Sequence, residues 1–306
     1  MPSQLLKFKE YMPSVILTGA SGMIGKALQN YLIQCGYAVK TLVRDKKKAD
    51  GINSFFWDYH AEEIDLKVFE TSDYIIHLAG ANVSKRWTFK YKKEIYDSRI
   101  MSTDFLFKII KSKNIRIKKM ISISGTGYYG DTTTLGLNEN SPTGNDFLAM
   151  VCRDWENSAK QMSSLKIPVC IFRLGVVMSP KGGFLKRIAT PIKYFVGVHL
   201  GDAQQMLSWL SIHDLCRLFV HAIEKNLVGT YNATASLPIT LEQIDNTLAA
   251  HLHRKIVLPN IPEWILKLVL GEMSTMILTN CHASNEKIKN TGFAFEDENF
   301  SAVLKY

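Results

Sequence analysis

The sequence predicts an α/β protein in which a doubly wound parallel sheet is followed by a smaller C-terminal α/β lobe. Short apolar strands alternate with amphipathic helices through the first 175 residues, a pattern typical of a parallel sheet with helices on both faces. A glycine-rich turn joins the first strand to the first helix. After Gly175 the alternation becomes irregular, and Pro180, Gly182 and Gly183 mark a loop. This change predicts the start of a second lobe.

The expected elements follow from the positions of the apolar runs and of the residues that end them. In the first part we expect strands over residues 15–17, 38–43, 53–57, 74–79, 119–124 and 169–174, and helices over 24–33, 66–70, 88–113 and 144–165. Later strands are expected over 206–210 and 229–233, and helices over 184–195, 213–225, 240–252, 263–270 and 283–290.

These elements predict a sheet domain over residues 13–175 and a substrate lobe over 176–306, with the chain crossing back to the sheet at about 206–235. Residues 1–12 form an N-terminal extension, and Met12-Pro-Ser14 repeats Met1-Pro-Ser3, which makes Met12 an alternative start. The segment 262–278 is open to three interpretations: a lid, the surface of a homodimer, or part of the core.

Composition narrows the class of protein. No apolar run reaches the roughly 18 residues that a membrane-spanning helix needs, and no signal peptide is apparent. The 5 cysteines form no Cys-x-x-Cys pair, which favours reduced thiols in the cytoplasm and no metal site. The net charge of +9 fits either a nucleic-acid partner or a lysine-rich solvated exterior. Because no nucleic-acid-binding module is visible, we favour the lysine-rich exterior and expect no nucleic-acid partner. We also expect a small-molecule substrate and no association with a membrane.

The turn Thr18-Gly-Ala-Ser-Gly-Met-Ile-Gly25 predicts a dinucleotide site. Gly19 permits the tight turn, Gly22 lets the backbone approach a pyrophosphate, and Gly25 lets the helix pack closely on the strand. The N-terminus of that helix offers free N–H groups and a partial positive charge to phosphates. The position of the turn between a strand and a helix raises the motif above chance. The alternative is a glycine-rich turn without a ligand.

Arg44 ends the second strand, where the residue that recognises the adenosine ribose is expected. An arginine there suits a 2′-phosphate, whereas an acidic residue suits a free 2′-hydroxyl. Lys46 and Lys47 add positive charge, while Asp45 argues the other way. We therefore expect NADP(H) in preference to NAD(H). The alternative is a surface arginine that merely closes the strand.

Two further stretches carry candidate chemistry. Ser124 lies at the end of the fifth strand, with Tyr128 and Tyr129 close behind it. A serine can hydrogen-bond a substrate oxygen, and a tyrosine can exchange a proton if a neighbouring cation lowers its pKa. The alternative is a turn whose tyrosines are packed in the core. Arg86 and Trp87 suit binding and stacking of an anionic substrate, or else the start of a helix.

Together these stretches resemble the extended short-chain dehydrogenase/reductases of the NAD-dependent epimerase/dehydratase family. The chain is most similar to an atypical, bacterial sugar-epimerase-like subgroup, whose own C-terminal segment resembles Gly271-Glu272 and Gly292-Phe-Ala-Phe295. The resemblance implies a Rossmann sheet, and it matches Ser124 to the serine of the usual catalytic trio. It also implies cofactor contacts from Gly19, Ala20, Ser21, Gly22, Met23, Ile24, Gly25, Arg44, Leu78, Ala79, Gly80, Ser122 and Val176.

One departure from the family divides the functional hypotheses. Active members carry Tyr-x-x-x-Lys on the helix after the serine strand, whereas the stretch from Asp146 to Arg153 contains neither residue. The first hypothesis is an NADP(H)-dependent oxidoreductase or epimerase that acts on a polar carbonyl or sugar-type molecule, with Ser124 and Tyr128 or Tyr129 in catalysis. The alternative is a non-catalytic NADP(H)-binding sensor or assembly protein.

Overall fold

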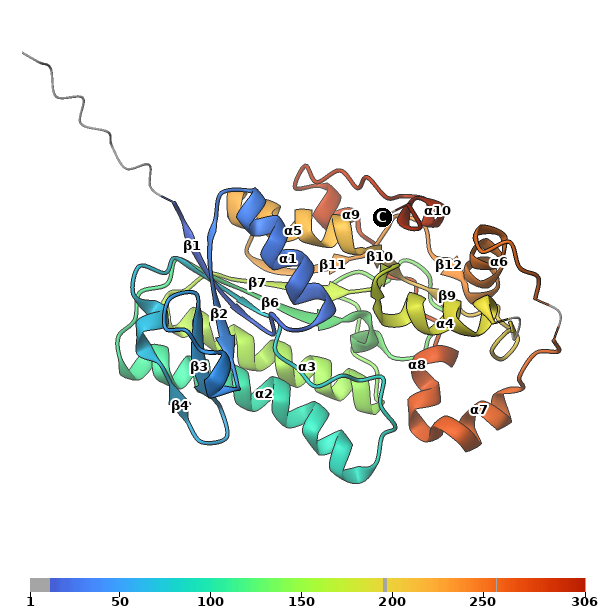
Figure 1. Cartoon of the computed structure of the whole chain (residues 1–306), viewed down its shortest axis with the longest axis horizontal. Helices are drawn as coiled ribbons and strands as arrows, with labels where there is room; N and C mark the ends of the chain where they lie inside the picture. The colour runs from blue at the N-terminus through green and yellow to red at the C-terminus, as the bar shows by residue number, and fades with distance from the viewer. Residues whose placement is uncertain (1–11, 195–196, 257, 306) are drawn as a thin grey trace, which may run out of the picture.

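An eight-stranded sheet forms the centre of the protein (Figure 1). The structure is a computed structural model that describes residues 12–194, 197–256 and 258–305, so the expected extension lies outside it except for Met12. The strand order is β11-β7-β6-β5-β1-β2-β3-β4, and all neighbours are parallel except β3 and β4. The predicted α/β class with a doubly wound parallel sheet is therefore confirmed. The strands are β1 Ser14–Thr18, β2 Ala38–Val43, β3 Ser54–Asp58, β4 Glu63–Ile64, β5 Tyr74–His77, β6 Lys119–Gly125, β7 Val169–Leu174 and β11 Gly229–Ala233.

Helices cover both faces of this sheet. Helices α1 (Met23–Gln34) and α5 (Ile212–Glu224) pack on one face, and α2 (Phe89–Ser112) and α3 (Phe147–Lys160) on the other (Figure 1). Strand β1 shows why its sequence is an unbroken apolar run. Val15 and Leu17 enter the core under α1 and α5, while Ile16 enters the core under α2. Both faces of a central parallel strand are buried, so each residue must be apolar.

The second part of the chain builds two small sheets beside the first. In one, β8 (Val176–Ser179) pairs with β10 (Trp209–Ser211), and in the other, β9 (Met206–Leu207) pairs with β12 (Ile239–Thr240). The single strand expected over 206–210 is thus wrong, because Ser208 separates two strands that join different sheets. The remaining helices are α4 Gly183–Lys193, α6 Leu241–His251, α7 Glu263–Leu270, α8 Thr275–Leu278, α9 Glu286–Lys289 and α10 Phe300–Val303.

Several helix ends follow from local chemistry. Thr88 caps α2 by accepting a hydrogen bond from the Tyr91 N–H, as its place before the apolar run predicts. Helix α3 begins later than the expected residue 144, because Asp146 caps it through the Ala149 N–H. The helix expected over 283–290 is shorter in the structure, where only α9 (Glu286–Lys289) is helical. Throughout the described ranges, no helix combines the length and apolarity needed to cross a bilayer.

Helix α7 presents apolar side chains to solvent. Trp264, Leu268 and Val269 are 66%, 71% and 60% exposed, so an interpretation of this stretch as simple core does not hold for them. The following turn is tied to the first part of the chain, since Lys92 of α2 forms an ion pair with Glu272 at 2.6 Å.

A buried histidine fixes the carboxyl ends of β1 and β5. The hydroxyl of Thr18 accepts hydrogen bonds from the N–H groups of Leu78 and Ala79 and lies 2.9 Å from Nδ1 of His77. The Thr18 proton therefore goes to Nδ1, and Nε2–H faces the hydroxyl of Thr103 at 3.0 Å. Burial lowers the pKa of His77 to about 3, which keeps the ring neutral. This network holds the loop after β5 against the glycine turn.

Candidate functional site

The turn between β1 and α1 leaves no room for a side chain at Gly19 or Gly25. Gly19 has a φ of +69°, and a Cβ added there would lie 2.7 Å from the carbonyl oxygen of Leu78. A Cβ on Gly25 would overlap the Gly19 carbonyl oxygen and lie 2.6 Å from the Cα of Ala20. Gly22, at the N-cap of α1, provides no side chain to cap the helix. The first N–H groups of α1 therefore remain available to a ligand.

A groove of about 540 Å³ begins at this turn and runs across the carboxyl ends of β2, β3 and β5. Seven of the expected cofactor residues line it: Gly19, Ser21, Gly22, Arg44, Leu78, Ala79 and Gly80. The other lining residues are Leu42, Val43, Asp45, Lys48, Trp57, Tyr59, Ala81, Asn82, Lys85, Tyr91, Glu94 and Ser98. This is the edge of a doubly wound sheet at which ligands bind.

Six expected cofactor residues do not line the groove: Ala20, Met23, Ile24, Gly25, Ser122 and Val176. Ile24 packs against the core, and Met23 contacts Gly182 and Gly183 at the start of α4. Ser122 is 1% exposed, with a hydroxyl that has no partner among the described residues. The side chains of these residues are not part of the groove lining, whereas Met23, Ile24 and Gly25 carry the backbone N–H groups that are free at the start of α1.

Positive charge gathers at the outer end of the groove. Arg44 and Lys48 are exposed, and neither forms an ion pair with any residue that the structure describes. The negative charge of Asp45 disfavours a phosphate nearby. Its carboxylate accepts a hydrogen bond from the Lys47 N–H and caps a short 3₁₀ turn. Lys46 turns away and pairs with Glu63 at 2.9 Å. The two unpaired cations give this end a field that suits a phosphate.

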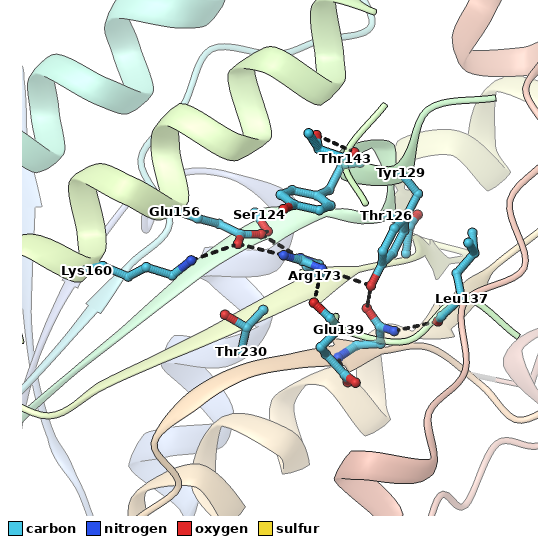
Figure 2. Close-up of polar contacts among 12 residues, drawn as sticks. Ser124, Thr126, Tyr129, Leu137, Glu139, Thr143, Glu156, Lys160, Arg173 and Thr230 are labelled. Atoms are coloured by element: carbon cyan, nitrogen blue, oxygen red, sulfur yellow. Dashed lines mark hydrogen bonds and ion pairs between the residues drawn. The ribbon is translucent and has the colours of Figure 1, made fainter. Parts of the chain in front are cut away.

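The serine expected in catalysis belongs to a buried ion-pair cluster (Figure 2). Ser124 is 5% exposed and donates to Glu156 of α3 at 2.7 Å. Arg173 of β7 donates through Nε and Nη2 to the two oxygens of Glu156, at 2.8 and 2.9 Å. The hydroxyl of Ser124 is thus occupied within the protein, and a second role toward substrate would require it to leave Glu156.

The two tyrosines differ sharply in their surroundings. Tyr129 is 4% exposed, and its hydroxyl donates to Asn232 at 2.6 Å and accepts from Arg173 (Figure 2). Burial raises its pKa to about 12, although Arg173 acts in the opposite direction. Tyr128 is half-buried, its ring centroid lies 3.4 Å from the Arg173 guanidinium carbon, and its hydroxyl forms no hydrogen bond with another described residue. Of the two, only Tyr128 offers a free hydroxyl.

The face of α3 where a Tyr-x-x-x-Lys pair would lie carries different groups. Leu148 packs beside Gly127, and Cys152 is buried beside Gly125. Burial raises the pKa of the Cys152 thiol to about 12, so it is no nucleophile at neutral pH. Arg153 is exposed and pairs with Asp154 at 2.9 Å. No group on this part of the helix can replace the missing acid.

The placement of Trp87 does not support stacking on a substrate. Its indole is 8% exposed, packs against Phe147 at 5.3 Å and donates to the Val83 carbonyl at 2.8 Å. Arg86 is exposed and lines neither the groove nor the hollow beside it. That hollow, of about 340 Å³, is lined by Asn82, Ser84, Gly183, Lys186, Arg187 and Thr190. It adjoins the groove through Asn82 and carries two cations that sequence reasoning missed.

Other residues missed from the sequence are Glu156, Tyr59 and Glu94. Glu156 lies among apolar residues on the buried face of α3, and a lone carboxylate on such a face signals a buried partner. Tyr59 follows β3 directly, at the strand ends where ligands bind. Nothing in the sequence marks Glu94 as a groove residue, since it is one of several charged residues on a long helix.

The fold and the groove together define a Rossmann protein of the short-chain dehydrogenase/reductase class. The model of the NAD dependent epimerase/dehydratase family matches residues 15–233, and a domain of unknown function, DUF1731, matches residues 261–306. The chain therefore belongs to the NAD-dependent epimerase/dehydratase family, as an atypical member with its own C-terminal segment. The resemblance found in the sequence is confirmed.

Individual relatives cover nearly the whole chain. An epimerase family protein SDR39U1 homologue, chloroplastic, from Arabidopsis thaliana is 35% identical over 94% of this chain and 84% of its own length. An epimerase family protein of Staphylococcus aureus is 32% identical over 96% of this chain and 98% of its own. The crystal structure of human epimerase family protein SDR39U1 with NADPH superposes with a TM-score of 0.85, at 27% identity, covering 95% of this chain and 98% of that one.

Proposed function

We propose that the protein binds NADP(H) in the groove and acts as an oxidoreductase or epimerase on a polar carbonyl or sugar-type molecule. The observation that carries the proposal is the groove itself, which joins the glycine turn after β1 to Arg44 and Lys48, two cations without an ion-pair partner among the described residues. Such a groove fits a pyrophosphate at one end and a 2′-phosphate at the other. The NADPH bound to the human relative supports the same choice of cofactor.

Replacement of Arg44 by alanine tests the cofactor assignment. Loss of the guanidinium should weaken NADPH binding by about ten- to a hundredfold, or about 1.5–3 kcal/mol of charge-assisted bonding. Binding of NADH, which lacks the 2′-phosphate, should change little. Fluorescence titration of both dinucleotides measures the ratio. An NADPH affinity that survives the substitution would remove Arg44 from the site.

The chemistry that we propose uses Tyr128 in preference to Tyr129. A bound nicotinamide supplies or accepts a hydride. The free hydroxyl of Tyr128 would then exchange a proton with the substrate oxygen, and the guanidinium of Arg173 over its ring would stabilise developing phenolate charge. Ser124 is assigned a positioning role, because it holds Glu156 and through it Arg173. The substrate is proposed to extend from the basic hollow beside Asn82 toward Tyr128, which itself lines neither the hollow nor the groove.

Single-turnover oxidation of NADPH against a panel of carbonyl compounds tests this chemistry. We expect Tyr128→Phe to slow hydride transfer by about a hundredfold, the usual scale of one general acid, while NADPH affinity stays within about twofold. Unchanged transfer in this variant would exclude Tyr128 as the proton donor.

A second candidate function is a non-catalytic NADP(H)-binding sensor or assembly protein. The observation that favours it is the face of α3, where Leu148 and Cys152 replace any acid or base. The two candidates separate in the same assay, since a sensor binds NADPH but transfers no hydride to any compound of the panel.

We place this activity in the cytoplasm, with a small molecule as substrate and neither nucleic acid nor membrane as partner. The cysteines support a reducing compartment: all five are free thiols, and four of them are buried. A homodimer remains part of the proposal, supported by the exposed apolar side chains of α7.

A further inference from the structure

The lining of the basic hollow comes mostly from one face of α4. Four of its lining residues lie three or four positions apart along this helix and therefore share a face: Gly183, Lys186, Arg187 and Thr190. Asn82 and Ser84, from the segment between β5 and α2, complete the lining. Among these described residues there is no carboxylate. The hollow thus carries two positive charges, with only hydroxyl and amide side chains besides.

Neither of the two cations is neutralised within the described part of the chain. Lys186 and Arg187 are both exposed and form no ion pair there. Arg187 is nevertheless held in place, because Nη1 donates to the Ser84 carbonyl at 2.8 Å. That bond joins α4 to the segment after β5 and leaves Nη2 without a hydrogen bond to any described residue. A cation that is fixed before its ligand arrives loses less entropy on binding, which favours a binding role over a solvated surface charge.

The backbone at the start of α4 adds to the positive field of the hollow. Gly183 has a φ of +65°, and a Cβ added there would lie 2.9 Å from the sulfur of Met23. Gly182, at the N-cap of α4, offers no side-chain oxygen to the first N–H groups of the helix. The N-terminus of a helix carries a partial positive charge, and this one borders the hollow beside Lys186 and Arg187.

We propose that the hollow binds an anionic head group of the substrate, a single carboxylate or phosphate, through Lys186 and Arg187. Both kinds of head group present several acceptor oxygens, to which a guanidinium or an ammonium donates strongly. The carbonyl end of the substrate extends past Asn82, which lines both the hollow and the cofactor groove. The anion-binding role that the sequence predicts for Arg86 thus falls to α4. The inference rests on the proposed function and narrows its substrate to small anionic carbonyl compounds.

The hollow does not suit a nucleotide-linked sugar. Its volume of about 340 Å³ lies near the lower end of small-molecule sites, which span about 300–1,000 Å³. Nucleobases bind to aromatic faces or apolar walls. No residue that the structure describes in the lining of the hollow is aromatic or has a large apolar side chain. Since the neighbouring groove is assigned to the cofactor, the substrate has no place for a base.

Isothermal titration into the protein loaded with NADP⁺ tests the head group without requiring turnover. Two comparisons each set an anionic carbonyl compound against a neutral one: 2-oxobutanoate against 2-oxobutanamide, and dihydroxyacetone phosphate against dihydroxyacetone. In at least one comparison the anion should bind at least about tenfold tighter, and that comparison identifies the head group as carboxylate or phosphate. The preference should shrink as the salt concentration rises, because it is electrostatic. UDP-glucose should bind more weakly than the preferred anion.

Lys186→Gln and Arg187→Gln test the two ligands of the head group. Each substitution should lower the affinity for the preferred anion about tenfold, while the affinities for its neutral partner and for NADPH stay within about twofold. Lys193→Gln is the matched control, because it removes an exposed cation from the same helix that does not line the hollow. The control should keep the preference of the wild type. An equal loss in the control would reduce the effect to the general positive field and overturn the assignment.

Three further results would overturn this inference while NADPH still binds the wild type. Equal affinities within both comparisons would show that the hollow does not select an anion. UDP-glucose that binds more tightly than either anion would contradict the limit on substrate size. A loss of NADPH affinity in Lys186→Gln or Arg187→Gln would place a phosphate of the cofactor in the hollow. A wild type that binds no NADPH overturns the proposed function as well.

Discussion

Arg173→Met is expected to lower the free energy of unfolding by about 3–5 kcal/mol. The buried Glu156 carboxylate loses its bidentate cation and keeps only the ammonium of Lys160, which is 51% exposed and lies 3.5 Å away. The side chains of Arg173 and Glu156 are 3% and 1% exposed, so water cannot replace the lost bonds. Tyr129 and the Glu139 carbonyl lose the same donor. Urea denaturation followed by circular dichroism measures the change, which should appear as a lower midpoint at constant slope.

The double variant Arg173→Met/Glu156→Leu is the control for this prediction. With both charges gone, no uncompensated carboxylate remains, and the protein should recover most of the lost stability. Ser124 then loses its acceptor, which limits the recovery. If the single variant proves as stable as the wild type, the pair does not contribute to the fold in the way that its geometry indicates.

Gly25→Ala should abolish measurable NADPH binding, with a loss of more than about a hundredfold, and should cost about 2–3 kcal/mol of stability. Gly25 lies inside α1, where alanine normally favours a helix. Here the new Cβ would overlap the Gly19 carbonyl and the Ala20 backbone, and backbone atoms cannot move aside as a side chain can. The turn must open, which displaces the N–H groups that face the groove.

Isothermal titration and thermal melting check this result, with Asn30→Ala as the matched control. Asn30 is exposed on the same helix, so its replacement by alanine gains helix propensity without a clash. The control should bind NADPH normally and melt no lower than the wild type. Normal binding by Gly25→Ala would mean that the contact between α1 and the turn is not needed for the site.

The parts of the site that could be predicted from sequence are those built locally. The glycine turn and Arg44 sit beside their own strands, so their positions follow once β1 and β2 are identified. Ser124 was placed correctly at its strand end, but its partner Glu156 comes from a helix 32 residues away. Whether a hydroxyl faces a ligand or a buried carboxylate depends on tertiary packing, and spacing along the chain carries no such information.

Trp87 and the segment 206–211 show the same limit. A tryptophan next to two cations suits a ligand surface, yet Phe147 from α3 covers it. The apolar run from Met206 to Leu210 predicts one strand. In the structure this run contains two strands, since β9 pairs with β12 and β10 pairs with β8. In each case the partner belongs to an element that is distant in the sequence, so local propensity cannot predict it.

The return of the chain through α5 and β11 limits how this protein can be divided. The chain leaves the main sheet after β7, comes back as α5 and β11, and leaves again toward β12. The side-chain nitrogen of Asn232 in β11 donates to the carbonyls of both Leu137 and Ser284, which fastens the returning strand to these two neighbouring segments. A single cut by a protease or a single recombination point therefore cannot separate the two parts as intact modules. Exchange of the second part between relatives would need three matched junctions, one after β7, one before α5 and one after β11.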